Sequence, residues 1–568
     1  MVTPLFGVES EYAVAAMAGK EAVRRDELVD RFVRTARRRL AHLQDSCSAS
    51  GMFLENGARF YIDCGLHPEM TTPECTNPWE LARYVKAGER ILESLVAEIQ
   101  AGDAAAAEIM CFRCNVDYGG TGSTWGCHES YLHRASPTKL PEQLIPHLVT
   151  RVVYTGAGGF NPLLSWPAFC VAPRLMHIQQ VVSADSTGNR GIFHTKNESL
   201  SSDGYNRLHI LCGESLCSEA AIVLKIGATA LVVAMAGEGL DPAAAVRLAA
   251  PLEALRAVSS DVTCQQKLRL AAGGETTAIQ IQRHFLELAE RRSGVLPPWS
   301  GAICALWRGT LDRLEAAPDS AGAVLDWAIK LRLFRDRAAR RGIPWERFPV
   351  LGSLVQPLYT ALAKSGHPGR NVRLNSLVGP KSPIPDEAAR AGELAAGQGV
   401  AWSDVERFLD LRDELYQIDT RFGQIGPRGI FAELDRRGVL EHRVPDVDNI
   451  EDAMRHPPAS GRARIRGEVV RRLSGQNKAD CTWAEIVHAD GRMLDLSDPF
   501  ADRETWSDPP FQEELFPPPD ADAAHPLASM SGDEYTRLQQ LLDSMRRRYG
   551  RARSRAQGPP EASQGPGR

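Results

Sequence analysis

The sequence predicts an α+β fold, and three observations indicate it. Short segments near the N-terminus alternate apolar and polar residues, as β-strands do. Longer segments further along repeat apolar residues at helical spacing. The two kinds of segment do not alternate regularly along the chain, which disfavours a sheet built from βαβ units. At 568 residues, the chain is long enough for about three or four domain-sized units.

The first expected strands carry polar residues on one face. In the opening segment Phe6 and Val8 lie on one side, with Glu9 and Glu11 on the other. Side chains two residues apart on a strand point the same way, so the two glutamates form one acidic face. Further strands are expected at residues 58–64 and 107–116.

The expected helices follow from apolar spacing and from capping residues. They cover residues 25–43, 78–99, 218–237, 277–292, 301–316 and 321–341. The most apolar run, residues 220–236, is interrupted by Lys225 and Thr229 and is shorter than the ~20 residues of a membrane span. It therefore predicts a buried core helix.

Composition changes divide the remainder of the chain. Residues 343–401 are rich in Gly, Pro and Ala, which predicts an insertion or a long surface loop. A smaller unit is expected at 402–502, with strands around 462–472 and 482–494. Residues 503–568 predict a mostly disordered tail with one short helix, capped by Ser531 and Glu534.

Charge and motif content exclude several functional classes. The net charge of −5 disfavours a nucleic-acid binder. The N-terminus lacks the features of a signal peptide, so the cytoplasm is the expected compartment and no membrane partner is expected. The twelve cysteines lack disulfide or zinc-site spacing and predict reduced thiols. No P-loop or dinucleotide fingerprint is present, so phosphate binding requires a metal and arginine side chains.

A metal–nucleotide site is one interpretation of the acidic strands. Arg59, Tyr61 and Asp63 share one face of the second strand, and Glu69 follows shortly after. Carboxylates this close favour a cation between them, and oxygen ligands suit Mg²⁺. Arg59 offers a fork for a phosphate oxygen. The alternative is a solvated strand face paired with Lys or Arg.

Three further elements have two interpretations each. Arg207 and His209 share a strand face, where a histidine is more often structural than a ligand. Arginines 462, 464 and 466 form a stripe at strand spacing that meets either an anion or solvent. Trp483 is a candidate for contact with an adenine, although most tryptophans fill cores.

Several of these segments, taken together and in order, resemble the Pup ligase and Pup deamidase family. They include residues 7–12 (GVESEY), 56–63 (NGARFYID), 67–69 (HPE), 126–132 (GCHESYL), 207–209 (RLH), 462–467 (RARIRG) and 498–500 (DPF). The matches run from residue 5 to about residue 502, apart from the segment after Gly342.

The resemblance implies a fold and a set of site residues. Residues 1–342 are expected to form a glutamine-synthetase-like catalytic domain whose curved antiparallel sheet holds Mg²⁺ and ATP. Residues 402–502 are expected to form a small C-terminal domain that completes the nucleotide site. By position, the family's magnesium ligands correspond to Glu9, Tyr61 and Glu69, its nucleotide-binding residues to Arg59, Thr72 and Trp483, and its catalytic aspartate to Asp63.

The implied reaction phosphorylates the C-terminal glutamate of a Pup-like modifier protein and joins it to a lysine of target proteins. A Pup deamidase or depupylase that uses the same aspartate is an alternative, as are a small-molecule carboxylate–amine ligase and a non-catalytic binding module. The interval 14–55 lacks the long loop of the deamidase branch, which favours the ligase, whereas Pro73 favours the deamidase. Residues 194–200 (HTKNESL) depart from the family pattern and leave the modifier's identity open.

Overall fold

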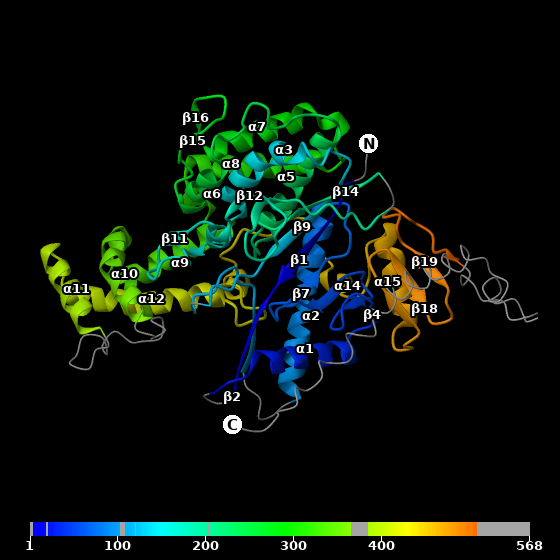
Figure 1. Cartoon of the computed structure of the whole chain (residues 1–568), viewed down its shortest axis with the longest axis horizontal. Helices are drawn as coiled ribbons and strands as arrows, with labels where there is room; N and C mark the ends of the chain where they lie inside the picture. Colours follow the sequence, from blue (N-terminus) through cyan, green and yellow to red (C-terminus); the bar gives the residue numbers. More distant parts are fainter. Residues whose placement is uncertain are drawn as a thin grey trace, which may run out of the picture. The chain divides into compact units, whose positions relative to one another are not determined.

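A large mixed sheet runs through the computed structural model, which describes residues 4–18, 21–102, 108–119, 121–201, 204–364 and 384–507 (Figure 1). In spatial order its strands are β12 (Gln180–Ser183), β13 (Gly191–His194), β14 (Asn206–Ile210), β9 (Cys127–His133), β1 (Leu5–Glu11), β7 (Pro68–Thr71), β6 (Arg59–Ile62), β5 (Met52–Leu54), β4 (His42–Asp45), β17 (Ala479–Cys481), β18 (Glu485–His488), β19 (Met493–Asp495) and β20 (Trp506–Ser507). Neighbouring strands are antiparallel except for the pairs β12–β13 and β4–β17. The predicted α+β class is confirmed.

The remaining elements surround this sheet. Three small sheets consist of β2 (Ala13–Ala18), β3 (Glu21–Ala22) and β8 (Glu108–Phe112); β10 (Gly159–Phe160) and β11 (Phe169–Cys170); and β15 (Leu268–Arg269) and β16 (Glu275–Thr276). The helices are α1 (Arg25–Arg39), α2 (Pro78–Ala101), α3 (Leu140–Thr150), α4 (Val152–Thr155), α5 (Glu219–Gly237), α6 (Pro251–Ser260), α7 (Ala278–Arg291), α8 (Ser300–Ala316), α9 (Asp326–Arg340), α10 (Phe348–Lys364), α11 (Pro385–Gly397), α12 (Trp402–Phe422), α13 (Ile430–Arg436), α14 (Ile450–Ala453) and α15 (Gly461–Leu473).

Local capping signals explain where the predicted helices begin. The Asn77 side chain accepts a hydrogen bond from the Glu80 backbone N–H at 2.8 Å, and Pro78 occupies the first turn of α2. Thr277 and Gln280 form a reciprocal capping box at the start of α7. These contacts satisfy backbone N–H groups that the helix itself leaves without partners.

The apolar helix α5 lies in the core, as predicted. Of the helices that the structure describes, it is the one long and apolar enough to cross a membrane, and 89% of its apolar window is buried in the protein. It packs against α2, α3, α7 and α8 (Figure 1). Burial on all sides explains why its apolar residues show no single stripe.

The central strands have one apolar and one polar face. Phe6 and Val8 of β1 and Tyr131 of β9 are buried in the same core as Leu81 and Val85 of α2. Because strand side chains alternate, Glu9 and Glu11 point to the opposite face. The polar face of the sheet is therefore the one available to a ligand.

The prediction of a strand at residues 462–472 is wrong, because this segment forms the helix α15. The alternation of three arginines imitates a strand, but Ile465 and Val469, four residues apart, share a buried core. Arg462 and Arg466 are buried on the helix, whereas Arg464 reaches Glu468 near the surface. The three arginines thus do not form one stripe.

The region 343–401 also differs from a surface loop. Its described part contains α10 and α11, which bury Leu351, Leu354 and Ala391 against α12. Strands β17, β18 and β19 extend the same sheet as β1, through the parallel pairing of β4 with β17. The expected tail helix lies outside the described residues, and the division of the chain into domains stays a prediction.

Candidate nucleotide and metal site

Two cavities meet at Glu9 on the polar face of the sheet. The larger one, here called the acidic cavity, has a volume of about 860 Å³. The smaller one, the tryptophan pocket, has a volume of about 110 Å³. Five of the predicted site residues line the acidic cavity, namely Glu9, Arg59, Tyr61, Asp63 and Glu69. Thr72 and Trp483 line the tryptophan pocket together with Glu9.

Strand register brings these residues together. In one row across the sheet, Tyr61 on β6 is opposite Glu69 on β7, and Glu69 is opposite Glu11 on β1. In the next row, Glu9 lies between Thr71 on β7 and His128 on β9. Directly opposite residues have Cβ atoms about 5 Å apart. The carboxylates of Glu11 and Glu69 are therefore neighbours.

Glu69 is a buried carboxylate in an acidic environment. It is 2% exposed, and its Oε1 has no hydrogen-bond partner among the described residues. Burial and the charges of Glu9 and Glu11 raise the pKa of Glu69 well above its ordinary value. A cation at this position would remove the repulsion and pair with the free oxygen. The donor set, oxygen atoms on neighbouring strands, fits Mg²⁺.

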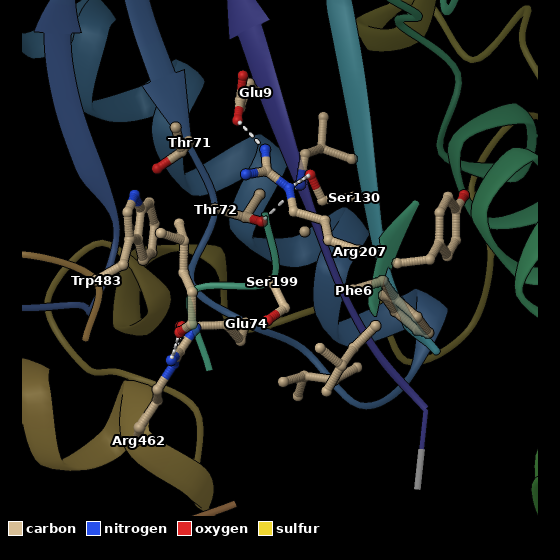
Figure 2. A pocket seen from close by; sticks show the side chains of 16 residues that line it. Phe6, Glu9, Thr71, Thr72, Glu74, Ser130, Ser199, Arg207, Arg462 and Trp483 are labelled. Carbon is tan, nitrogen blue, oxygen red and sulfur yellow. Dashed lines mark hydrogen bonds and ion pairs between the residues drawn. The ribbon is translucent and has the colours of Figure 1, made fainter. Parts of the chain in front are cut away.

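Glu9 is stabilised in its charged form. Burial raises its pKa, but the neighbouring His128 ring and the Arg207 guanidinium outweigh this effect, so the pKa of Glu9 lies well below its ordinary value. The Arg207 Nη2 lies 3.4 Å from Glu9 Oε1 in the tryptophan pocket (Figure 2), and Glu9 also lines the acidic cavity. The Glu9 carboxylate is thus an anionic group available to both cavities.

Tyr61 is the third predicted metal ligand. Burial, followed by the charges of Glu9 and Glu69, raises the pKa of the Tyr61 hydroxyl above its ordinary value. Tyr61 therefore contributes a neutral hydroxyl oxygen beside two carboxylates. Its ring stacks under the Arg59 guanidinium, 4.0 Å from the ring centre, and Arg59 Nε donates to Asp45 Oδ2 at 2.7 Å.

Asp63 lies just beyond β6 in a tight loop that orients its carboxylate. Its Oδ1 accepts hydrogen bonds from the backbone N–H groups of Gly65 (2.9 Å) and His67 (2.7 Å). The His67 ring Nδ1 lies 3.2 Å from Asp63 Oδ2 and 3.6 Å from Glu11. Burial lowers the pKa of His67, but its hydrogen bonds to Asp63 and Glu11 raise it to about 9 overall. A protonated His67 therefore holds Asp63 at the cavity wall.

The tryptophan pocket has one aromatic wall and one polar end. Trp483 packs edge-on against Phe53, with ring centres 5.1 Å apart, and lies across from Thr71 and Thr72 (Figure 2). Thr72 Oγ1 accepts a hydrogen bond from the Val8 N–H at 3.1 Å, which fixes this wall to β1. A flat heterocycle fits beside the Trp483 ring, with the polar end of the pocket directed to Glu9.

Sequence reasoning missed residues that strand spacing indicated. The sequence places Glu11 beside Glu9 without selecting it, yet Glu11 on β1 lies directly opposite Glu69 on β7. His128, two residues before Ser130 on β9, was not selected although its Nε2 lies 3.7 Å from Glu11 Oε1. His209 also lines the acidic cavity. Burial lowers the pKa of His209 to about 3, so its ring is neutral.

Comparisons with known proteins agree on one family. The family model described as "Pup-ligase protein" matches residues 4–354 and 393–487. A Pup–protein ligase from a Nocardioides species is 31% identical over 514 residues, covering 87% of this chain and 96% of that protein.

Two solved structures resemble this fold across most of its length. The complex between the prokaryotic ubiquitin-like protein Pup and its ligase PafA has a TM-score of 0.67 and 27% identity, covering 88% of this chain and 90% of that chain. The Pup ligase PafA in complex with ADP has a TM-score of 0.61 and 27% identity, covering 84% and 91%. Residues 355–392, between the two matched segments, fall within the predicted insertion. The chain belongs to the Pup ligase family.

Proposed function

We propose that this protein is an ATP-dependent ligase that joins Pup to lysine side chains of target proteins. The observation that carries the proposal is the convergence of Glu9, Asp63 and Glu69 in one cavity that meets the tryptophan pocket. Membership of the family supports the substrate pair of ATP and Pup. The cytoplasm is the compartment that we propose, because all twelve cysteines are free thiols.

ATP is the proposed occupant of the joined cavities. The adenine lies beside Trp483 and Thr72, and the phosphates extend past Glu9 into the acidic cavity. A related ligase was solved in complex with ADP, which supports ATP as the co-substrate. Arg59, which lines the acidic cavity, is the proposed contact for a phosphate oxygen.

Glu9, Tyr61 and Glu69 are the proposed holders of Mg²⁺. They lie on β1, β6 and β7 and face the same cavity. When bound, the magnesium ion supplies positive charge that offsets the charge of the phosphoryl oxygens. The Glu69 Oε1, which has no hydrogen-bond partner among the described residues, supports this assignment.

The proposed reaction has two steps. First, the side-chain carboxylate of Pup's C-terminal glutamate attacks the γ-phosphorus of ATP, which gives an acyl phosphate and ADP. Then a lysine amine attacks the acyl carbon, and phosphate leaves as the isopeptide bond forms. Because the reference pKa of a lysine amine is about 10.4, the amine must lose a proton to attack. Asp63 is the proposed acceptor of that proton, since His67 and the loop N–H groups fix its position.

Asp63→Asn tests the role of the carboxylate. The variant keeps the side-chain size but cannot accept a proton, so we expect unchanged ATP binding and loss of isopeptide formation. ADP release and Pup–target conjugates are measured with Pup ending in Glu, and Asp312→Asn on α8, an exposed aspartate, is the control. Retained conjugation by the Asp63→Asn variant would refute the role. Ammonia release from Pup ending in Gln, without conjugation, would identify a deamidase instead.

A further inference from the structure

Among the described residues that line the acidic cavity, Arg190 is an arginine that makes no ion pair. Of the described residues that line it, Arg59, Arg190 and Lys196 carry a permanent positive charge. Arg59 pairs with Asp45, and Lys196 Nζ lies 3.3 Å from Glu198. Arg190 makes no ion pair with a carboxylate in the part of the chain that the structure describes.

Arg190 is held in a fixed orientation just before β13. Its Nε donates to the Ser186 carbonyl at 2.9 Å, and its Nη1 donates to Thr124 Oγ1 at 2.8 Å. Its backbone carbonyl accepts from the N–H groups of Gln179 and Gln180. Its Nη2 makes no hydrogen bond within the described ranges, so one edge of the guanidinium remains available to a ligand.

A buried guanidinium, that of Arg174, adds positive potential near the half-buried Arg190. Arg174 is 1% exposed, its Nη1 donates to the Leu211 carbonyl at 2.5 Å, and Leu211 lines the acidic cavity. The Arg174 Nε is buried without a hydrogen-bond partner among the described residues. Burial and the charge of Arg174 lower the pKa of Arg190. A half-buried guanidinium with a buried one nearby favours the binding of an anion.

This cationic wall lies within electrostatic range of the proposed reaction centre. Glu11 interacts with Arg190 through charge and is also a neighbour of the Asp63–His67 pair. The ligand atoms of Glu11, Asp63 and His67 all lie within 4.8 Å of one another. The acidic cavity therefore has carboxylates on one wall and a guanidinium on another.

We propose that Arg190 binds the α-carboxylate of the modifier's C-terminal glutamate, while the side-chain carboxylate of the same residue faces ATP. This inference rests on the proposed function, and it assigns a residue that recognises the free C-terminus of the modifier. A terminal glutamate brings two carboxylates, and a guanidinium edge binds one of them with directed hydrogen bonds. An internal glutamate lacks the second carboxylate, so Arg190 makes the ligase specific for a free C-terminus.

The experiment compares Pup ending in glutamate with Pup whose terminal glutamate carries an α-amide. For the wild type, we expect kcat/KM for ADP release to be lower with the amide by about tenfold or more, because a charge-assisted hydrogen bond is lost. Arg190→Gln lowers kcat/KM for the free acid by a similar factor and brings the acid-to-amide ratio to about one. Arg190→Lys keeps the positive charge but not the forked guanidinium, so we expect its acid-to-amide ratio to lie between those of the wild type and Arg190→Gln. The KM for ATP stays unchanged.

Arg269→Gln is the matched control, because Arg269 is exposed on β15, and it keeps the wild-type ratio. Equal use of acid and amide by the wild type overturns the inference alone. A full preference for the acid in folded Arg190→Gln protein also overturns it. If neither form of Pup causes ADP release by the wild type, the proposed function fails, and the inference fails with it.

Discussion

Glu69 and Glu129 are both buried carboxylates, but their surroundings have opposite charge. Glu129 is fully buried, with Arg151 at 2.7 Å and Lys225 at 3.4 Å. Glu69 faces Glu9 and Glu11 and keeps one oxygen without a partner among the described residues. Glu129 is balanced by the protein itself, whereas Glu69 has no such balance among the described residues, which is why we propose it as a cation ligand. This contrast separates a structural charge from a candidate metal ligand.

Glu69→Gln separates stability from function. The change removes like-charge repulsion, so we expect the melting temperature in EDTA to stay the same or rise. The Mg²⁺ concentration that gives half-maximal ADP release should increase by about tenfold or more, since one ionic ligand is lost. Thermal unfolding and a magnesium titration measure the two effects, with the exposed Glu253→Gln as control. An unchanged magnesium requirement would show that Glu69 is not a ligand.

Glu129 predicts how stability changes with acid. Burial raises its pKa, but the charges of Arg151 and Lys225 lower it to about 2, below the ordinary 4.5. Because the pKa of Glu129 is lower in the folded state than in the unfolded state, its stabilising effect is complete at pH values above the unfolded-state pKa. This effect is lost as the pH falls toward the folded-state pKa. Urea unfolding at about pH 7, 5 and 3 should therefore show the steepest loss in the lowest interval.

The variant Glu129→Gln supplies the check on this assignment. It leaves Arg151 and Lys225 buried without a counter-ion, so we expect a loss of about 3–5 kcal/mol at pH 7. Its remaining stability should depend less on pH in the acidic range than that of the wild type. The same acid dependence in both proteins would contradict the pairing.

At the scale of elements, α15 connects the C-terminal segment to the tryptophan pocket. Arg462 Nε donates to Glu74 Oε1 at 2.6 Å, and Arg466 pairs with the other oxygen of Glu74. The Arg466 guanidinium also stacks 4.7 Å from the centre of the Trp483 ring. The helix thereby fixes the aromatic wall of the tryptophan pocket. The sequence did not predict this role, because Glu74 is almost 400 residues away from its partners Arg462 and Arg466.

Glu74→Gln tests this connection. Two buried arginines lose their shared counter-ion, so we expect about 3–5 kcal/mol of destabilisation and weaker ATP binding. Glu468→Gln removes an exposed pair on the same helix and should change stability by about 0.5 kcal/mol or less. Urea unfolding and nucleotide titration measure both. Unchanged ATP affinity in a destabilised Glu74→Gln protein would show that the contacts of α15 do not support ATP binding.

Features that depend on interactions between residues close in the sequence could be predicted, whereas features that depend on distant contacts could not. Helices α2, α5 and α7 were predictable because Asn77, Ser218 and Thr277 cap them locally. Strands β1 and β6 were predictable from alternation alone. Their register was not, because the pairing of Glu11 with Glu69 depends on contacts between segments far apart in the chain. The family resemblance assigned Glu9 as a ligand, whereas Glu11 and His128 could be placed beside Glu69 and Glu11 only from the strand register.

At the scale of the whole described fold, one sheet carries every predicted site residue or borders it. Strands from both ends of the chain join in this sheet, since β17 pairs with β4. Trp483, between β17 and β18, is thereby brought to the same surface as Glu9 and Thr72 (Figure 2). The sequence resemblance named these residues, but only the strand order explains why positions 9 and 483 meet.

Anomalous diffraction from crystals grown with Mn²⁺, as a substitute for magnesium, and a non-hydrolysable ATP analogue locates the metal directly. We expect a manganese peak between the oxygens of Glu9, Tyr61 and Glu69, with the adenine against Trp483 and the γ-phosphate on the side of Asp63. Manganese outside the acidic cavity, or a base away from Trp483, would contradict this expectation.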